Sequence, residues 1–88
     1  KVLNAALRVA VRDGFVGVKR DVVAREARVG KATVSYAFGD LPLLRNAVVE
    51  HAMKHQQWKV VGEALVAQNG RAKRLSDAEK HRAYASLN

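Results

Sequence analysis

A cluster of small and polar side chains lies in the first half of the chain, and each of them can contact nucleic acid. Lys31 can donate to the acceptors of guanine or to a phosphate, while Thr33 and Ser35 can hydrogen-bond base edges or contact the thymine methyl group. Tyr36 can reach a phosphate oxygen with its hydroxyl, and the small Ala32 allows the backbone to approach closely. These residue types predict contact with duplex DNA.

Other chemistry has less support in the residue pattern. Ser35 lacks a nearby His–acid pair and no paired carboxylates are placed to line a cleft, so we expect no enzyme activity. A phosphate-binding loop would need Ser or Thr directly after Lys31, and a Gly where Arg25 stands, five residues before Gly30. Residues 14–17 have the glycines of a KH-type RNA-binding loop, but no strands are indicated, so helix termination is favoured.

Metal and cofactor binding are also not expected. The chain has no cysteine, which excludes thiolate ligands and disulfides. His51 and His55 have metal-ligand spacing on a helix and Glu50 precedes them, but the pattern offers no third ligand. A packing or interface role is therefore the favoured interpretation of the two histidines.

The elements that must position the DNA-contacting side chains are predicted to be three short helices. Apolar spacing places them from Val2 to Asp13, from Lys19 or Arg20 to Ala27, and from Lys31 to Ala37 or Phe38. Gly14 is expected to cap the first helix, and Phe15 to fold back on its apolar stripe. Val29-Gly30 is expected to form the turn between the second and third helices, with Arg28 at its start.

The second half of the chain is predicted to contain one long helix and one short helix. Asp40 is a good N-cap for a helix from Leu41 to about Gln68, with a break at Gly62 as the alternative. Residues 69–74 are expected to form a basic linker whose Arg71, Lys73 and Arg74 either follow a phosphate backbone or are simply solvated. Ser76 and Glu79 form a capping box for a last helix, about Asp77 to Ser86.

Two short helices joined by a tight turn, with an earlier helix behind them, form a helix-turn-helix. Its inner face must be apolar but small, as Ala24, Ala27 and Val29 are. We expect residues 1–50 to form the DNA-binding domain and residues 51–88 a helical extension. The predicted DNA-binding residues are Lys19, Arg20, Arg28, Gly30, Lys31, Ala32, Thr33, Ser35 and Tyr36.

Three stretches resemble the N-terminal DNA-binding domain of the TetR (tetracycline repressor) family. They are Ala5-Ala6-Leu7-Arg8 through Gly14-Phe15-Val16-Gly17, the run from Val23 to Phe38, and Leu43-Leu44-Arg45-Asn46-Ala47-Val48, which resembles the start of that family's fourth helix. The resemblance covers about the first 50 residues. It implies a homeodomain-like three-helix unit, dimeric binding to a palindromic operator, and usually repression.

The chain departs from the TetR pattern at several positions. Val18 and Lys19 stand where Thr or Ser usually opens the second helix, and Leu41 stands where a phosphate-contacting Lys is common. Arg28 replaces a turn Gly and Gly30 replaces a Ser, so Arg28 must adopt the turn backbone at a cost if its φ is positive. About 38 residues follow the matching region, too few for the family's ligand pocket, so no small-molecule effector is expected.

The apolar stripe beyond residue 50 is predicted to form the homodimer interface, because three short helices cannot easily cover so long a stripe. Its predicted residues are Ala52, His55, Trp58, Val61 and Leu65. The alternative function is a small protein-interaction regulator or antitoxin-like module that binds a protein partner through the Trp58 helix.

Charge and hydropathy agree with a DNA-binding protein. The 88 residues carry 16 Lys and Arg against 8 Asp and Glu, and the net charge of +8 favours a polyanionic partner. Apolar runs are too short for a membrane span, and Asn4, Arg8, Arg12 and Asp13 interrupt the N-terminal apolar residues, so no signal peptide is indicated. We expect an all-α, cytoplasmic, nucleoid-associated bacterial regulator of transcription.

Overall fold

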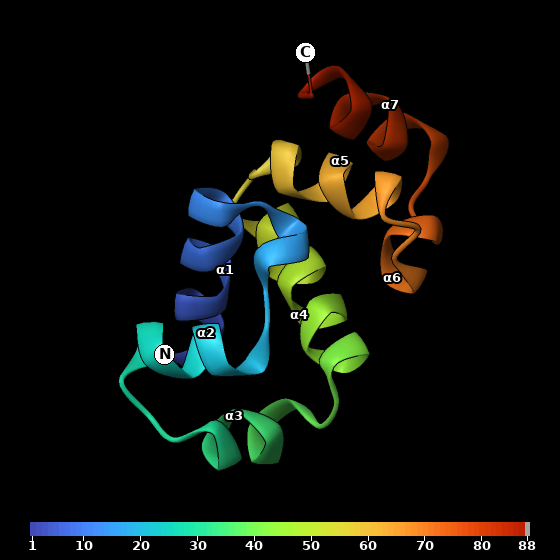
Figure 1. Ribbon diagram of the computed structural model, residues 1–88. Helices are drawn as coiled ribbons and strands as arrows, with labels where there is room; N and C mark the ends of the chain where they lie inside the picture. The colour runs from blue at the N-terminus through green and yellow to red at the C-terminus, as the bar shows by residue number, and fades with distance from the viewer. Residues whose placement is uncertain (88) are drawn as a thin grey trace.

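Helices form nearly all of the regular structure in the computed structural model, which describes residues 1–87 (Figure 1). This part of the chain contains no strand, which confirms the predicted all-α class. The elements are α1 (Val2–Asp13), the 3₁₀ turn η1 (Phe15–Gly17), α2 (Arg20–Ala27), α3 (Lys31–Phe38), α4 (Leu41–Lys54), α5 (Trp58–Val66), α6 (Gly70–Lys73) and α7 (Asp77–Ala85).

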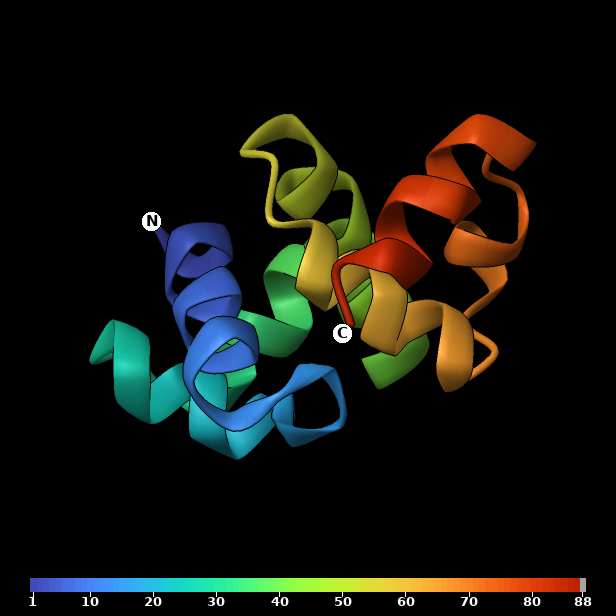
Figure 2. The same cartoon turned by 90° about the horizontal axis from the view of Figure 1, so that it is seen from above.

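The molecule is elongated, with extents of 37 × 21 × 19 Å, and α3 lies at the opposite end from α7 (Figure 1). α1 packs against α2 and α4, while α5 packs against α4, η1 and α7. Figure 2 shows α7 lying along α5 on one side of the molecule and α1 with α2 on the other. Phe15, Leu44, Val61 and Ala83 belong to one continuous core, so residues 1–50 and 51–87 share their buried apolar contacts.

The first three helices have the predicted bounds. Gly14 ends α1 with a φ of 89°, a conformation that glycine adopts without a Cβ clash, and its N–H donates to the oxygen of Ala10. Phe15 then turns back into the core, where its side chain is only 2% exposed. The fold therefore brings the chain into η1 and α2 with a large aromatic anchor at the bend.

The predicted long fourth helix is wrong, because α4 ends at Lys54 and α5 begins only at Trp58. Gln56 has a φ of 58°, and the N–H of Gln57 donates to the oxygen of Ala52 at 2.8 Å, which closes the helix end. Gly62, the expected alternative break, lies inside α5. The bend at residues 55–57 turns α5 so that its apolar face meets α7 and η1.

The predicted basic linker is also wrong, since residues 70–73 form the short helix α6. Its N-cap Asn69 accepts a hydrogen bond from the N–H of Ala72 and donates through Nδ2 to Oδ1 of Asn46 on α4. Ala72 is fully buried and Leu75 nearly so. The burial of these two apolar side chains, which stand among basic residues in the sequence, therefore holds α6 against the rest of the protein.

The capping box predicted at the start of α7 is confirmed. Ser76 Oγ accepts from the N–H of Glu79, and Glu79 Oε1 accepts from the N–H of Ser76. The backbone hydrogen bond from Ser76, followed by the side-chain bond, lowers the pKa of Glu79.

We expect Ser76→Ala to lower the free energy of unfolding by about 1 kcal/mol at neutral pH, because it removes the cap. Because the pKa of Glu79 is lower in the folded chain, its bond stabilises the fold above the unfolded pKa of about 4.3. That stability is lost as the pH falls through the folded pKa. Urea unfolding should show Glu79→Gln less stable than the parent at pH 7 and equal to it below about pH 3. A gap that persists at low pH would contradict this origin.

Candidate nucleic-acid interface

Three residues, Arg28 to Gly30, connect α2 to α3 and fix the angle at which α3 leaves α2. Arg28 is left-handed, with φ 59° and ψ 46°, and the next residue, Val29, donates its N–H to the oxygen of Ala24 at 3.0 Å. Gly30 is extended and its oxygen accepts from the N–H of Thr33, which starts α3. The turn therefore has the short length predicted from the sequence, and Arg28 has the positive φ that is costly for a non-glycine residue.

α3 is attached to the rest of the fold along one narrow face. Val34 is its one fully buried side chain and Phe38 is half-buried, and both belong to the face that packs on α2 and α4. On the α2 side, Val23, Ala24 and Ala27 are buried and leave little bulk between the helices. Most of the α3 surface is consequently open to solvent at one end of the molecule (Figure 1).

The predicted contact residues lie on this open surface. Lys31, Ala32 and Thr33 are exposed, and Tyr36 is 96% exposed, an unusual state for an aromatic side chain. Successive helical residues are about 100° apart, so Ala32 and Tyr36 point away from the buried Val34. α3 thus presents short side chains and one projecting phenol.

A hydrogen bond not predicted from the sequence joins α2 to α3. Arg20 Nη1 donates to Ser35 Oγ at 3.2 Å. The two residues are 15 positions apart and belong to different helices, so no local pattern indicates their contact. This bond holds a guanidinium beside the outer face of α3, and it leaves Ser35 only partly exposed.

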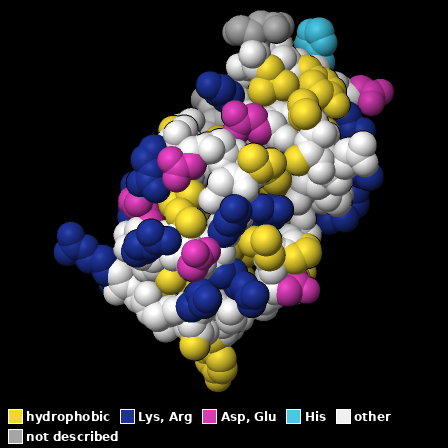
Figure 3. Space-filling view, viewed as in Figure 1, with side chains coloured by type: hydrophobic (Ala, Val, Ile, Leu, Met, Phe, Trp, Pro, Cys, Tyr) yellow, Lys and Arg dark blue, Asp and Glu magenta, His cyan; other side chains and the backbone are white. Residues whose placement is uncertain are grey.

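Positive charge without a carboxylate partner gathers around the same end. Within residues 1–87, no Asp or Glu lies within ion-pair distance of Lys19, Arg28 or Lys31, and all three are exposed. Figure 3 shows Lys and Arg side chains across the lower half of the molecule, where α1 to α3 lie. An anionic ligand would meet these charges without first breaking ion pairs.

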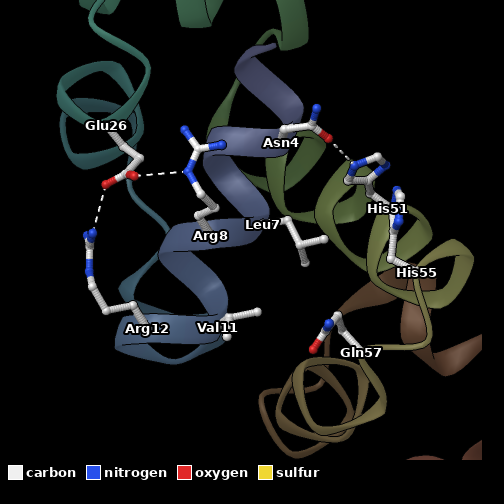
Figure 4. Close-up of a pocket in the computed structure, with 9 residues that line it drawn as sticks. All are labelled: Asn4, Leu7, Arg8, Val11, Arg12, Glu26, His51, His55 and Gln57. Carbon is white, nitrogen blue, oxygen red and sulfur yellow. Dashed lines mark hydrogen bonds and ion pairs between the residues drawn. The ribbon is translucent and has the colours of Figure 1, made fainter.

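Three other cations nearby, Arg8, Arg12 and Arg25, are paired with carboxylates. Arg8 Nε and Arg12 Nη1 bind the carboxylate of Glu26 at 3.1 and 2.7 Å (Figure 4). Arg12 also pairs with Asp13. Hydrogen bonds from Arg12, and then from Arg8, lower the pKa of Glu26 and keep it ionised. Arg25 lies 3.7 Å from Asp21. The ion pairs between α1 and α2 therefore serve the packing of the two helices.

Two charged residues from the second half of the chain hold the connection that leads into α2. Glu63 Oε1 on α5 accepts from the N–H of Phe15 at 2.9 Å. Arg45 on α4 donates to the oxygens of Val18 and Val16 at 3.1 and 3.2 Å, with its guanidinium 6.0 Å from the Phe15 ring. Neither contact was predicted from the sequence, although Glu63, the single Glu among the apolar residues of α5, was an available signal.

The predicted dimer-interface residues are mostly inside the protein. Ala52 and Val61 are fully buried and Leu65 is 7% exposed, so these three cannot form a contact surface as predicted. The reason is the bend after α4, which folds the stripe inward. Trp58 is half-buried with Arg82 stacked 5.2 Å from its ring, and His55 is exposed.

A separate open groove of about 590 Å³ lies between α1, α2 and the end of α4 (Figure 4). Its apolar lining comes from Leu7 and Val11, and its polar lining includes the Arg8–Glu26 pair. His51 stands at its edge, where partial burial, followed by the charges of His55 and Lys54, lowers its pKa. The groove includes no residue of α3.

The strained turn offers a test that separates stability from ligand contact. We expect Arg28→Gly to raise the free energy of unfolding by about 0.5–1 kcal/mol, because a left-handed non-glycine residue costs more than the chain entropy that glycine adds. The same change should weaken DNA binding by removing an exposed cation. Gln56→Gly at the end of α4 is the matched control, expected to be equally stabilising without any effect on DNA. Urea unfolding measures the stability of both variants, and titration with duplex DNA measures their affinity. Equal DNA affinity of the two variants would contradict a role for the Arg28 charge in binding.

Comparisons with known proteins identify no relative. No family model, no curated protein and no solved structure matched the chain. Within residues 1–87, no helix is both long and apolar enough to cross a membrane. The same residues contain no cluster of three or more His, Asp or Glu side chains arranged to hold a metal ion.

Proposed function

We propose that this protein is a sequence-specific regulator of transcription that binds duplex DNA through α2 and α3, used as a helix-turn-helix of the TetR type. The observation that carries the proposal is the exposed outer face of α3, next to three cations that have no carboxylate partner within the described residues. A helix attached by one buried side chain can enter the major groove, which admits one α-helix. The proposal describes a binding protein and not an enzyme.

The residues have distinct proposed roles. Thr33 and Ser35 read base edges, and Lys31 donates to guanine or to a phosphate, while Tyr36 reaches a phosphate oxygen from the most exposed position of α3. Ala32 and Gly30 keep the start of the helix small, so that its N–H groups approach the DNA closely. The exposed cations at the two ends of α2, which are Lys19, Arg20 and Arg28, bind the phosphate backbone.

The proposed regulator acts as a homodimer on a palindromic operator, because helix-turn-helix proteins read two half-sites with two copies. The TetR resemblance favours a repressor. Of the predicted interface residues, His55 and Trp58 remain accessible, so the dimer contact must use other surface as well. The alternative of a protein partner bound through the Trp58 helix has less support. The apolar face of that helix is occupied by the protein's own core.

Four single substitutions separate base reading from phosphate binding. We expect Thr33→Ala and Ser35→Ala to lower the discrimination between operator and unrelated DNA, at about 1–3 kcal/mol for each good base contact. Lys19→Ala and Arg20→Ala should weaken binding to all sequences alike. Fluorescence anisotropy with both duplexes measures the ratio directly. A uniform loss from Thr33→Ala and Ser35→Ala would show that they do not read bases.

The Arg20–Ser35 hydrogen bond predicts that these two changes are not independent. Because Arg20 donates to Ser35 Oγ, the double variant should lose less DNA affinity than the sum of the single losses. Thr33 has no such contact with Arg20 and provides the matched pair, whose losses should add. Additive losses for both pairs would contradict a role for the bond in DNA binding.

A further inference from the structure

Two imidazole rings lie together at the end of α4, away from the proposed DNA surface. His51 is in the last turn of α4 and His55 is its C-cap, and their ring centroids are 4.3 Å apart at an interplanar angle of 69°. Residues four apart lie on the same face of a helix. A transition metal binds imidazole nitrogen at about 2.0–2.1 Å, so two rings this close can reach a common ion with small side-chain rotations.

A residue from another helix orients the first of these rings. Asn4 Oδ1 on α1 lies 2.7 Å from His51 Nε2, and the two residues are 47 positions apart. With Asn4 Oδ1 as the acceptor, His51 carries its proton on Nε2 and its Nδ1 lone pair is free. Metal-binding histidines usually donate their second ring N–H to an oxygen acceptor in this way. Figure 4 shows Asn4, His51 and His55 side by side along one edge of the groove.

We propose that His51, through Nδ1, and His55 bind one divalent transition-metal ion of the zinc or copper class, with Asn4 as a positioning residue. Imidazole nitrogens favour Cu²⁺, Zn²⁺ and Ni²⁺, whereas Mg²⁺ and Ca²⁺ require oxygen ligands. Water that enters from the open groove completes the coordination of the proposed ion. From the sequence alone, a packing or interface role was the favoured interpretation of the two histidines. The contact between Asn4 and His51 favours a ligand role instead, because it orients the His51 ring. The site shares His55 with the proposed dimer contact but contains no α3 residue, so metal binding is tested without DNA.

Calorimetric titration of the full chain with ZnCl₂ tests the site. We expect one Zn²⁺ per chain, bound by the parent and lost in both His51→Ala and His55→Ala. Asn4→Ala should weaken binding about 10-fold, the usual loss when the partner of a ligating histidine is removed. His81→Ala, in which an exposed histidine of α7 is removed, is the matched control and should bind as the parent does. Circular dichroism verifies that each variant is folded.

Electron paramagnetic resonance of the Cu²⁺ complex gives a second readout, because the nitrogen hyperfine pattern reports the number of imidazole ligands. We expect two ligands in the parent and one in His55→Gln, which retains a polar side chain at the exposed C-cap. Unchanged Zn²⁺ affinity in either histidine variant, or loss in His81→Ala, would overturn the site. Unchanged affinity in Asn4→Ala would overturn the assignment of Nδ1 as the ligand.

Discussion

Replacing Gly62 with alanine should destabilise the protein by about 2 kcal/mol, although alanine is the better helix former. Gly62 lies inside α5, where α7 crosses closely. A Cβ at this position would lie 2.5 Å from the backbone oxygen of Ala83 and 2.9 Å from Cγ of Leu87. A side chain could rotate away from such a contact, but a helix carbonyl can move only if α7 moves with it.

Gly70→Ala is the matched control, because a Cβ on Gly70 meets nothing within 4 Å. Propensity alone makes both substitutions stabilising by up to about 1 kcal/mol, so the expected signs differ only through the contact with α7. Urea unfolding of the two variants measures the difference. Stabilisation by Gly62→Ala would contradict the packing of α7 on α5.

Removing three of the exposed cations around α3 should abolish most of the sequence-independent DNA affinity. Lys19→Ala, Arg28→Ala and Lys31→Ala together take away exposed charges without carboxylate partners in the described part of the chain. Each phosphate contact contributes about 0.9 to the slope of log K against log salt. The slope should therefore fall by about 2 to 3, and the affinity at low salt by orders of magnitude.

A second triple variant controls for net charge. Lys54→Ala, Lys59→Ala and Lys73→Ala also remove three exposed positive charges, but from α4 to α6, away from α3 (Figure 1). We expect its salt slope to stay within about 0.5 of the parent's, because long-range attraction is screened beyond about 10 Å in 0.1 M salt. Equal losses in the two triple variants would show that net charge, and not the α2–α3 surface, determines binding.

The helix bounds could be predicted where the chain ends its helices with recognisable residues. Gly14 closes α1, Asp40 accepts from the N–H of Leu43 at the start of α4, and Ser76 begins α7. The end of α4 could not be predicted, because left-handed Gln56 occupies the position where glycine is usual. Gln68, with a φ of 61° after α5, ends that helix in the same way. A non-glycine residue that ends a helix in the unfavourable left-handed conformation gives no local signal in the sequence.

The candidate site could likewise be predicted in part. Exposure of α3 followed from its spacing, since Val34 and Phe38 were the apolar positions that could face inward. The contacts that position the surface could not be predicted, because they join residues far apart in the chain. The Phe15–Glu63 bond spans 48 residues and the Arg20–Ser35 bond spans 15. For the same reason the stripe of α5 was assigned to a dimer contact, when α7 and η1 cover it.

Equilibrium binding of the purified protein to the DNA upstream of its own gene is the most direct test of the central claim. A random duplex of equal length is the control, and both are titrated by fluorescence anisotropy across a range of salt. The account predicts at least about 10³-fold tighter binding to the upstream DNA, with two protomers per site and a steep salt dependence. Binding to neither duplex at moderate salt would contradict it.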